Sequence, residues 1–214
     1  MENILKIKNL SKSFKGYKIF ENLDLECVKG KIYGIVGRNG SGKSVLFKMI
    51  LGFYYPDKNS QIELFGEKVG LKGSFPKDIG AIIESPGFLP QYTGFKNLKI
   101  LKDINKKISD EDVRQMLIKV GLDPNLKTKV KNYSLGMIQR LGIAQALMEN
   151  PKFVILDEPF NGLDKTGVSE IRELILEYKN KGTTFLLSSH VQEDIDILCD
   201  EVYEINDKKL EKIR

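Results

Sequence analysis

Several features that mark particular classes of protein are scarce or absent in this chain of 214 residues. It has no tryptophan, a single histidine, two cysteines, no internal repeats and no proline- or serine-rich linker. Its longest apolar stretches, such as FVIL at 153–156, are strand-sized and far too short to span a bilayer. The first ten residues mix charged and apolar side chains, unlike a secretory signal. We therefore expect no membrane span, and we expect Cys27 and Cys199 to be small core residues in a reducing compartment.

The charge balance is basic, with 34 Lys and Arg against 29 Asp and Glu and a net charge of +5. Such a balance can favour nucleic acid or an anionic membrane surface. Here the lysines are spread among acidic residues, and aromatic residues rarely lie between them. The pattern indicates a solvated surface, with contact to an anionic surface as the alternative, and no nucleic acid is expected as a partner.

Strand-like and helix-like patterns alternate in the two ends of the chain. Residues 4–10 and 23–28 alternate apolar and polar side chains, as half-buried strands do, and the more apolar segment 31–37 predicts a buried strand. Further strands are predicted at 61–66, 79–84, 153–157, 183–189 and 201–207. A helical pattern follows at 44–52, and others separate the later strands. Strands that alternate with helices predict an α/β fold with a parallel sheet.

The middle of the chain differs, because its pattern is helical from about residue 95 to residue 148. Ser109 followed by three acidic residues is typical of a helix start, and a second long helix is predicted from about Ser134 to Asn150. We therefore predict one domain over residues 1–214. Its core comprises 1–84 and 150–214, and a helical subdomain is inserted at about 85–149.

A glycine-rich loop follows the buried strand. Residues 37–44, GRNGSGKS, fit the pattern G-x-x-x-x-G-K-[ST] in full and lie between a strand and a helix, as a phosphate-binding loop requires. We expect Lys43 to reach the β- and γ-phosphates and the Ser44 hydroxyl to bind Mg²⁺. The predicted nucleotide ligands in the loop are Gly37, Arg38, Asn39, Gly40, Ser41, Gly42, Lys43 and Ser44.

Two carboxylates end the apolar strand in FVILDEP, residues 153–159. Asp157 is placed to hold Mg²⁺, directly or through water, and Glu158 to orient or deprotonate the attacking water. Successive strand residues point to opposite faces, so both acids can serve one site only if the strand has ended. Pro159 indicates that it has.

A second helix start of the kind that binds phosphate lies in NYSLGMIQR, residues 132–140. Together with GRNGSGKS, FVILDEP, NGLD at 161–164 and SSH at 188–190, it makes the chain resemble the nucleotide-binding subunit of an ATP-binding-cassette (ABC) transporter over nearly its full length. The resemblance implies a P-loop NTPase fold, with a RecA-like core, an N-terminal antiparallel β part and an inserted helical subdomain. It also implies an ATPase that uses ATP and Mg²⁺ at the cytoplasmic face of the cell membrane.

The resemblance accounts for the second phosphate-binding helix start. In the family, two cassettes bind head to tail, and each signature helix closes over the ATP held by the other cassette. This implies that Ser134 and the backbone N–H of Gly136 bind the partner's γ-phosphate. It implies a nucleotide-side role for Asp164, in the loop after the catalytic acid, and a switch role at the γ-phosphate for His190.

The same resemblance implies an aromatic residue near the N-terminus that stacks on adenine. By family spacing this is Phe14, with Tyr17 as the alternative. Either side chain could instead pack under the N-terminal sheet.

The chain departs from the family pattern at Glu84, in IIESPGFLP, where most members have glutamine. An ionised glutamate offers only acceptor oxygens, whereas glutamine also offers an N–H donor. We expect Glu84 to take part in catalysis and metal binding and to couple the site to the transporter with an altered Mg²⁺ dependence. Glutamate followed by SPGF resembles the branch of bacitracin- and lantibiotic-resistance exporters. Glu84 could also be an ordinary strand-end carboxylate.

The signature itself departs from the usual Leu-Ser-Gly-Gly-Gln. Leu135 replaces a glycine, which would cost about 1–2 kcal/mol if the position had positive φ and little if φ were helical. Met137 removes an amide that could reach the partner's ribose. The closed dimer is still expected to form.

These features imply an ATPase subunit that powers separately encoded transmembrane permease subunits, as an exporter. Its partner cassette is a second copy of itself or a paralogous ATPase subunit. The permease is expected to dock near residues 85–98, with Tyr92 and Phe95 as candidate contacts. The alternatives are a soluble cassette ATPase that acts on ribosomes or nucleic acid, and a protein that binds ATP without turnover. The presence of both Glu158 and His190 argues against the latter.

Overall fold

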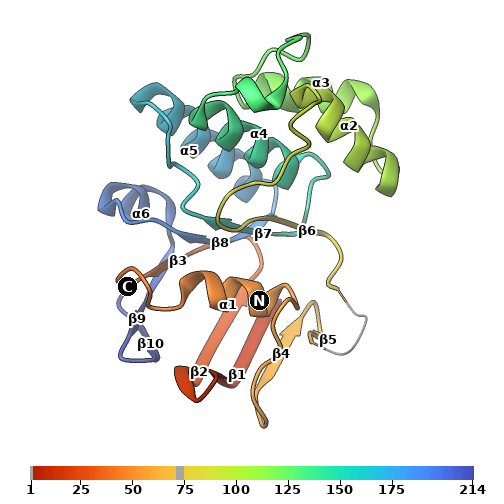
Figure 1. Ribbon diagram of the computed structural model, residues 1–214. Coiled ribbons are helices and arrows are strands. Elements are labelled where there is room, and N and C mark those ends of the chain that lie inside the picture. Colours follow the sequence, from red (N-terminus) through yellow and green to blue (C-terminus); the bar gives the residue numbers. More distant parts are fainter. Residues whose placement is uncertain (1, 71–74) are drawn as a thin grey trace.

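The computed structural model describes residues 2–70 and 75–214, and within these residues the strands form two sheets (Figure 1). The smaller sheet has the strand order β2-β1-β4-β5, and all its pairs are antiparallel. Its strands span Tyr17–Val28 (β2), Asn3–Phe14 (β1), Gln61–Leu64 (β4) and Glu67–Lys68 (β5). This sheet is the antiparallel β part that was expected near the N-terminus.

The larger sheet has six strands in the order β10-β9-β3-β8-β7-β6 within the described residues. Neighbouring strands from β9 to β6 are parallel, and only β10 pairs in the antiparallel sense. The strands span Lys209–Lys212 (β10), Glu201–Asn206 (β9), Ile32–Val36 (β3), Thr184–Ser188 (β8), Phe153–Asp157 (β7) and Ile79–Ile82 (β6). Because the parallel strands end at one edge of the sheet, the loops that follow β3, β6, β7 and β8 meet there.

Helices cover both faces of the larger sheet. They are α1 (Lys43–Ile50), α2 (Gly94–Asn105), α3 (Asp110–Lys119), α4 (Leu135–Leu147), α5 (Lys165–Asn180) and α6 (Gln192–Leu198), with a 3₁₀ turn at Val130–Asn132. Figure 1 shows α1 on the side of the sheet that faces β1 and β2, and α2 to α5 grouped on the opposite side. None of the described helices combines the length and the apolar character that crossing a bilayer requires.

The core lies in two clusters, one on each face of the larger sheet. Phe153 and Ile155 of β7 pack with α1 and the smaller sheet, whereas Val154 and Leu156 pack with α4 and α5. Since alternate residues of a strand point to opposite faces, a strand covered on both sides must be apolar throughout. This explains the continuous apolar run that the sequence shows at 153–156.

The predicted fold class is confirmed. The differences lie at the element ends and in two short strands, β5 and β10, that were not predicted from the sequence. Ser109 caps α3 through a capping box, as its sequence indicates. The helix predicted from Ser134 to Asn150 spans Leu135–Leu147, with Ser134 as its N-cap. Strands β1 and β2 extend well beyond the predicted 4–10 and 23–28. The prediction stopped short because burial does not alternate in their shared hairpin end, where Phe20 is the one buried residue of 11–22. Both cysteines are buried and unbridged, as expected.

Close packing of α4 on β6 gives a direct test of this architecture. A Cβ on Gly80 would overlap the carbonyl oxygen of Ala146, a backbone atom that cannot rotate away, whereas a Cβ on Gly87 would meet nothing within 4 Å. Neither glycine has a positive φ. We therefore expect Gly80→Ala to lower the free energy of unfolding by about 1–3 kcal/mol through overpacking. Gly87→Ala should change it by less than about 0.5 kcal/mol. Urea unfolding measures both, and equal values for the two variants would contradict the packing.

Candidate nucleotide-binding and hydrolysis site

A pocket of about 560 Å³ lies at the edge of the larger sheet where the parallel strands end. It is formed by the phosphate loop, the start of α1 and the loops after β6 and β7. Its lining residues are Ile19, Asn39, Gly40, Ser41, Gly42, Lys43, Ser44, Val45, Glu84, Ser85, Asp157, Glu158 and Asn161. The structure thus brings six of the eight predicted phosphate-loop residues together with three of the four predicted carboxylates, Glu84, Asp157 and Glu158. Gly37, Arg38 and His190 lie outside this lining.

Backbone geometry explains why the loop requires glycine. Gly37 and Gly42 have φ values of 147° and 106°, which side chains rarely tolerate. A Cβ on Gly42 would also lie 2.7 Å from the Phe20 ring, and one on Gly37 would lie 2.8 Å from the Ile205 carbonyl oxygen. Gly42 is the N-cap of α1, so the first N–H groups of that helix open toward the pocket. A helix start of this kind binds phosphate.

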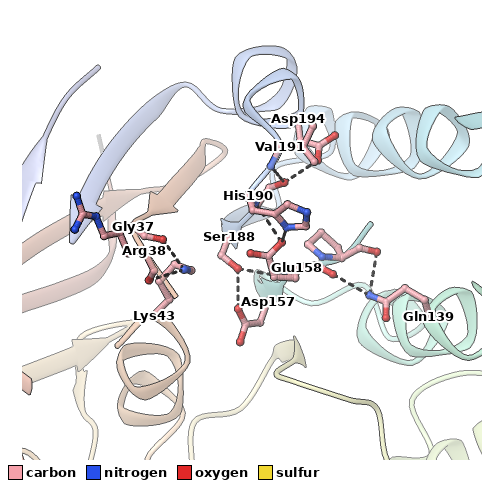
Figure 2. A network of polar contacts seen from close by, with 12 residues as sticks. Gly37, Arg38, Lys43, Gln139, Asp157, Glu158, Ser188, His190, Val191 and Asp194 are labelled. Carbon is pink, nitrogen blue, oxygen red and sulfur yellow. Dashed lines mark hydrogen bonds and ion pairs between the residues drawn. The ribbon is translucent and has the colours of Figure 1, made fainter. Parts of the chain in front are cut away.

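Lys43 lies over the loop that precedes it. Its Nζ donates to the Gly37 carbonyl oxygen at 2.8 Å and lies 3.5 Å from the Arg38 carbonyl oxygen (Figure 2). Ser41 Oγ is buried with no hydrogen-bond partner among the described residues. A buried hydroxyl without a partner is costly, so this loop fits a ligand that brings acceptor oxygens.

Asp157 ends β7 with both carboxylate oxygens engaged by hydroxyls. Ser44 Oγ donates to Oδ2 at 2.6 Å, and Ser188 Oγ donates to Oδ1 at 2.7 Å. No group of three or more His, Cys, Asp and Glu side chains in residues 2–70 and 75–214 is arranged to hold a metal by itself. Mg²⁺ is usually bound by one or two protein oxygens together with substrate phosphates. Ser44 and Asp157 therefore fit Mg²⁺ that arrives with a nucleotide.

Glu158 turns out of the strand immediately after Asp157. Its φ of 52° is left-handed, and its N–H donates to Ser188 Oγ at 3.0 Å. Its Oε2 lies 2.8 Å from His190 Nδ1 and accepts from the His190 backbone N–H at 3.2 Å (Figure 2). The strand thus ends where Pro159 indicated, and two of the three predicted catalytic residues, Glu158 and His190, are in contact across the ends of β7 and β8. A carboxylate held by an imidazole in this way can orient water or accept its proton.

Glu84 lies two residues beyond the end of β6 and also lines the pocket. Its carboxylate pairs with Lys48 Nζ, and it raises the pKa of that lysine through their hydrogen bond. The sequence pointed to Glu84 but not to Lys48. The signal that could have found Lys48 is its position four residues after Ser44, which puts both side chains on one face of α1.

The signature residues lie at the start of α4 and do not line this chain's own pocket. Ser134 Oγ accepts from the Met137 N–H at 3.2 Å, and Gly136 packs closely against the Gly162 carbonyl oxygen. Leu135 does not have a positive φ, so the strain considered for it is absent, and its side chain is 64% exposed. Met137 is half-buried and packs against the core cluster on the α4 and α5 face of the larger sheet.

The remaining predicted residues lie outside the pocket lining. Asp164 caps α5 by accepting from the Gly167 N–H at 2.9 Å. Phe14 packs edge-to-face on Tyr54 with ring centroids 5.3 Å apart, and Tyr17 is exposed. Ile19 is the side chain from this hairpin that lines the pocket. Adenine stacking on Phe14 therefore stays a prediction.

Besides Lys48, two residues that support the catalytic carboxylates were not predicted from the sequence. Ser188 bridges Asp157 and the Glu158 backbone. The sequence signal that could have identified it is the end of the strand at 183–189 in small polar residues. Gln139 is buried, and its Nε2 donates to the Pro159 carbonyl oxygen at 2.9 Å. Nothing in a helical segment indicates such a contact.

The candidate permease contacts differ from each other. Tyr92 is exposed, as a docking residue should be, with 38% of its surface accessible. Phe95 is half-buried against the core cluster on the α4 and α5 face of the larger sheet, and the Arg114 guanidinium lies 4.4 Å from its ring centroid. Phe95 is therefore less suited to contact a partner than its sequence position indicated.

Comparison with known proteins agrees with this geometry. The family model for "ABC transporter" matches residues 20–161. The chain is 41% identical over 206 residues to the bacitracin transport ATP-binding protein BcrA of Enterococcus faecalis, covering 94% of this chain and 66% of that protein. It is 38% identical over 207 residues to the lantibiotic transport ATP-binding protein SrtF of Streptococcus pyogenes, covering 97% and 89%.

Among solved structures, the chain is similar to an ATP-binding subunit of an ABC transporter. The TM-score is 0.87 and the identity 25%, over 98% of this chain and 90% of that one. Sequence and fold thus agree, and the chain belongs to the ABC transporter family, as an ATP-binding subunit with ATPase activity.

Proposed function

We propose that Glu158 and His190 form the hydrolytic pair of this ATPase. The observation that carries the proposal is the 2.8 Å contact between Glu158 Oε2 and His190 Nδ1, at the sheet edge that also holds the phosphate loop. Glu158 uses one oxygen for both contacts with His190, so its other oxygen can accept from the attacking water. The water oxygen attacks the γ-phosphorus, its proton passes to Glu158, and the bond to ADP breaks.

The nucleotide is held by groups that surround this pair. The N–H groups of residues 37–44 and the Lys43 ammonium bind the phosphates, and adenine stacks on Phe14. Ser44 and Asp157 would hold Mg²⁺, with Glu84 beside them. The metal supplies positive charge that offsets the charge on the transferred phosphoryl group. Ser188 positions both Asp157 and Glu158.

Subunits of this family work as dimers with transmembrane permease partners. We assign Ser134 and Gly136 to the nucleotide held by a second cassette, either a copy of this chain or a paralogue, and Asp164 to the nucleotide side of the loop after the catalytic acid. The location of Ser134 and Gly136 outside their own chain's pocket supports this. Helical residues at about 85–149 would form the subdomain that carries the signature and meets the permease on the cytoplasmic face of the membrane.

The transported substrate is proposed to be a peptide antibiotic, carried outward. The relatives named for bacitracin and lantibiotic transport support this substrate class. Glu84 followed by SPGF supports the same branch. The alternative of a soluble ATPase that acts on ribosomes or nucleic acid finds no support in these relatives.

The role of Ser188 can be separated from general destabilisation. Ser188→Ala removes the hydrogen bonds to Asp157 Oδ1 and to the Glu158 N–H. Ser188 acts through the residues that hold the metal and the water. We therefore expect kcat of Ser188→Ala to fall by about 10-fold or more, as it does when hydrogen-bond partners of metal ligands are removed. The control, Ser109→Ala, removes the cap of α3 and should lower stability by about 1 kcal/mol without lowering kcat. Steady-state phosphate release measures both, and an unchanged kcat in Ser188→Ala would contradict the role.

Dimer closure can be trapped by slowing hydrolysis. In Glu158→Gln the amide cannot accept the water's proton, so ATP should persist and light scattering should report a doubled mass on ATP addition. Adding Ser134→Asp keeps a side chain that can cap α4 but places a negative charge against the partner's γ-phosphate, and should prevent closure. A monomeric mass for Glu158→Gln with ATP, even beside the permease, would argue against the head-to-tail dimer.

The membrane partner can be identified by affinity capture. We expect the tagged chain, purified from detergent-solubilised membranes of the source cell, to bring down a polytopic membrane protein that mass spectrometry identifies. The Glu158→Gln variant with ATP should retain it. Ribosomal proteins or nucleic acid in its place, released by moderate salt, would favour the alternative function.

A further inference from the structure

Glu84 and Glu158 occupy equivalent places on neighbouring strands. In the parallel pair β6 and β7, Ile82 lies opposite Leu156, so each glutamate lies two residues beyond a paired position. Both have left-handed backbones, with φ values of 60° and 52°. Both line the same pocket. At each strand end, the left-handed backbone places the glutamate side chain in the pocket that contains the phosphate loop.

The two carboxylates have different partners on opposite sides of the site. Glu158 contacts His190 from the loop after β8, whereas Glu84 contacts Lys48 from α1. Lys48 lies one helical turn after Ser44, so one face of α1 presents Ser44 to Asp157 and Lys48 to Glu84. The phosphate-loop helix therefore contacts the loops after both β6 and β7.

Charge explains why such a partner is needed at position 84. Asp157, Glu158 and Glu84 together bring three carboxylates to a pocket built for a polyanion. The Glu84 side chain is 62% exposed and the Lys48 side chain 24% exposed, so their attraction is partly screened by water but still neutralises one of the three charges. A glutamine at this position would need no such neutralisation.

We propose that Lys48 is a positioning residue that neutralises Glu84 and competes with Mg²⁺ for its carboxylate. The ion pair then determines how strongly nucleotide binding depends on Mg²⁺. Without metal, Lys48 offsets the repulsion between Glu84 and the phosphates. With metal, Glu84 can interact with Mg²⁺ only at the expense of its contact with Lys48. This inference rests on the proposed binding of ATP and Mg²⁺ at this site.

The test is equilibrium binding of a fluorescent ATP analogue, first in EDTA and then during a Mg²⁺ titration. In Lys48→Met, Glu84 loses its counter-ion, so affinity in EDTA should fall about 3- to 5-fold, the upper part of the range for a partly exposed ion pair. The Mg²⁺ concentration at half-saturation should fall by a similar factor, because the carboxylate is available to the metal. Glu84→Gln should strengthen binding in EDTA, and the double variant should remove the Lys48→Met effect on the metal titration.

Two controls make the outcome specific. Lys179→Met removes a lysine of matched exposure, 23%, from an ion pair with Asp200 on the far side of the core, and should leave both curves unchanged. Lys48→Arg keeps the charge and should also leave the Mg²⁺ midpoint within about 2-fold of the wild type. If Lys48→Met does not fold, Lys48→Gln removes the same charge with a polar side chain and should give the same two shifts.

The inference fails if Lys48→Met gives the same Mg²⁺ midpoint as Lys179→Met. It also fails if Lys48→Met shifts that midpoint equally with glutamate and with glutamine at position 84, because Lys48 would then act on the nucleotide alone. Neither result would contradict the proposed function, because the wild-type chain would still bind the analogue. Absence of binding by the wild type, with and without Mg²⁺, would instead refute the proposed nucleotide site.

Discussion

The whole site depends on the register of the parallel strands. Asp157 of β7 lies opposite Ser188 of β8, and Leu156 lies opposite Ile82 of β6. Because parallel strands in register end at the same level, the loops after them meet without any strand having to bend. The hydrogen bond that Ser188 Oγ donates to Asp157, and the one that it accepts from the Glu158 N–H, can form only in this register. A shift by one residue would turn these side chains to the opposite face of the sheet.

Strain at the strand ends is offset by the contacts of the same residues. Non-glycine residues with left-handed φ cost on the order of 1–2 kcal/mol each, and both Glu84 and Glu158 have this conformation. The Ser188 and His190 contacts stabilise it at Glu158, and the Lys48 ion pair stabilises it at Glu84. The turn at Glu158 lets adjacent acids, Asp157 and Glu158, face one site, which a continuing strand would forbid.

Local patterns predicted much of this site, and long-range contacts account for what they missed. The phosphate loop was predictable because its backbone geometry demands glycine within one short segment, and the strand FVILD because burial on both faces demands apolar residues. Gln139 was not predictable, because its partner, Pro159, is distant in sequence. The spacing of Lys48 from Ser44 placed it on the site's face of α1, but its partner, Glu84, is also distant in sequence. The packing of Leu135 likewise depends on Gly162, which belongs to another loop.

The start of the signature helix and the catalytic loop form one packed unit. Gln139 of α4 donates to the Pro159 carbonyl oxygen, and Leu135 and Gly136 pack on Gly162 in the loop that follows. Gln139 is buried, so breaking its contact would leave a polar group without a partner, at a cost of about 1–3 kcal/mol. A displacement of α4 therefore displaces the backbone behind Glu158 as well. In a head-to-tail dimer, where α4 serves the partner's nucleotide and Glu158 its own, this unit would link the two sites mechanically within each chain.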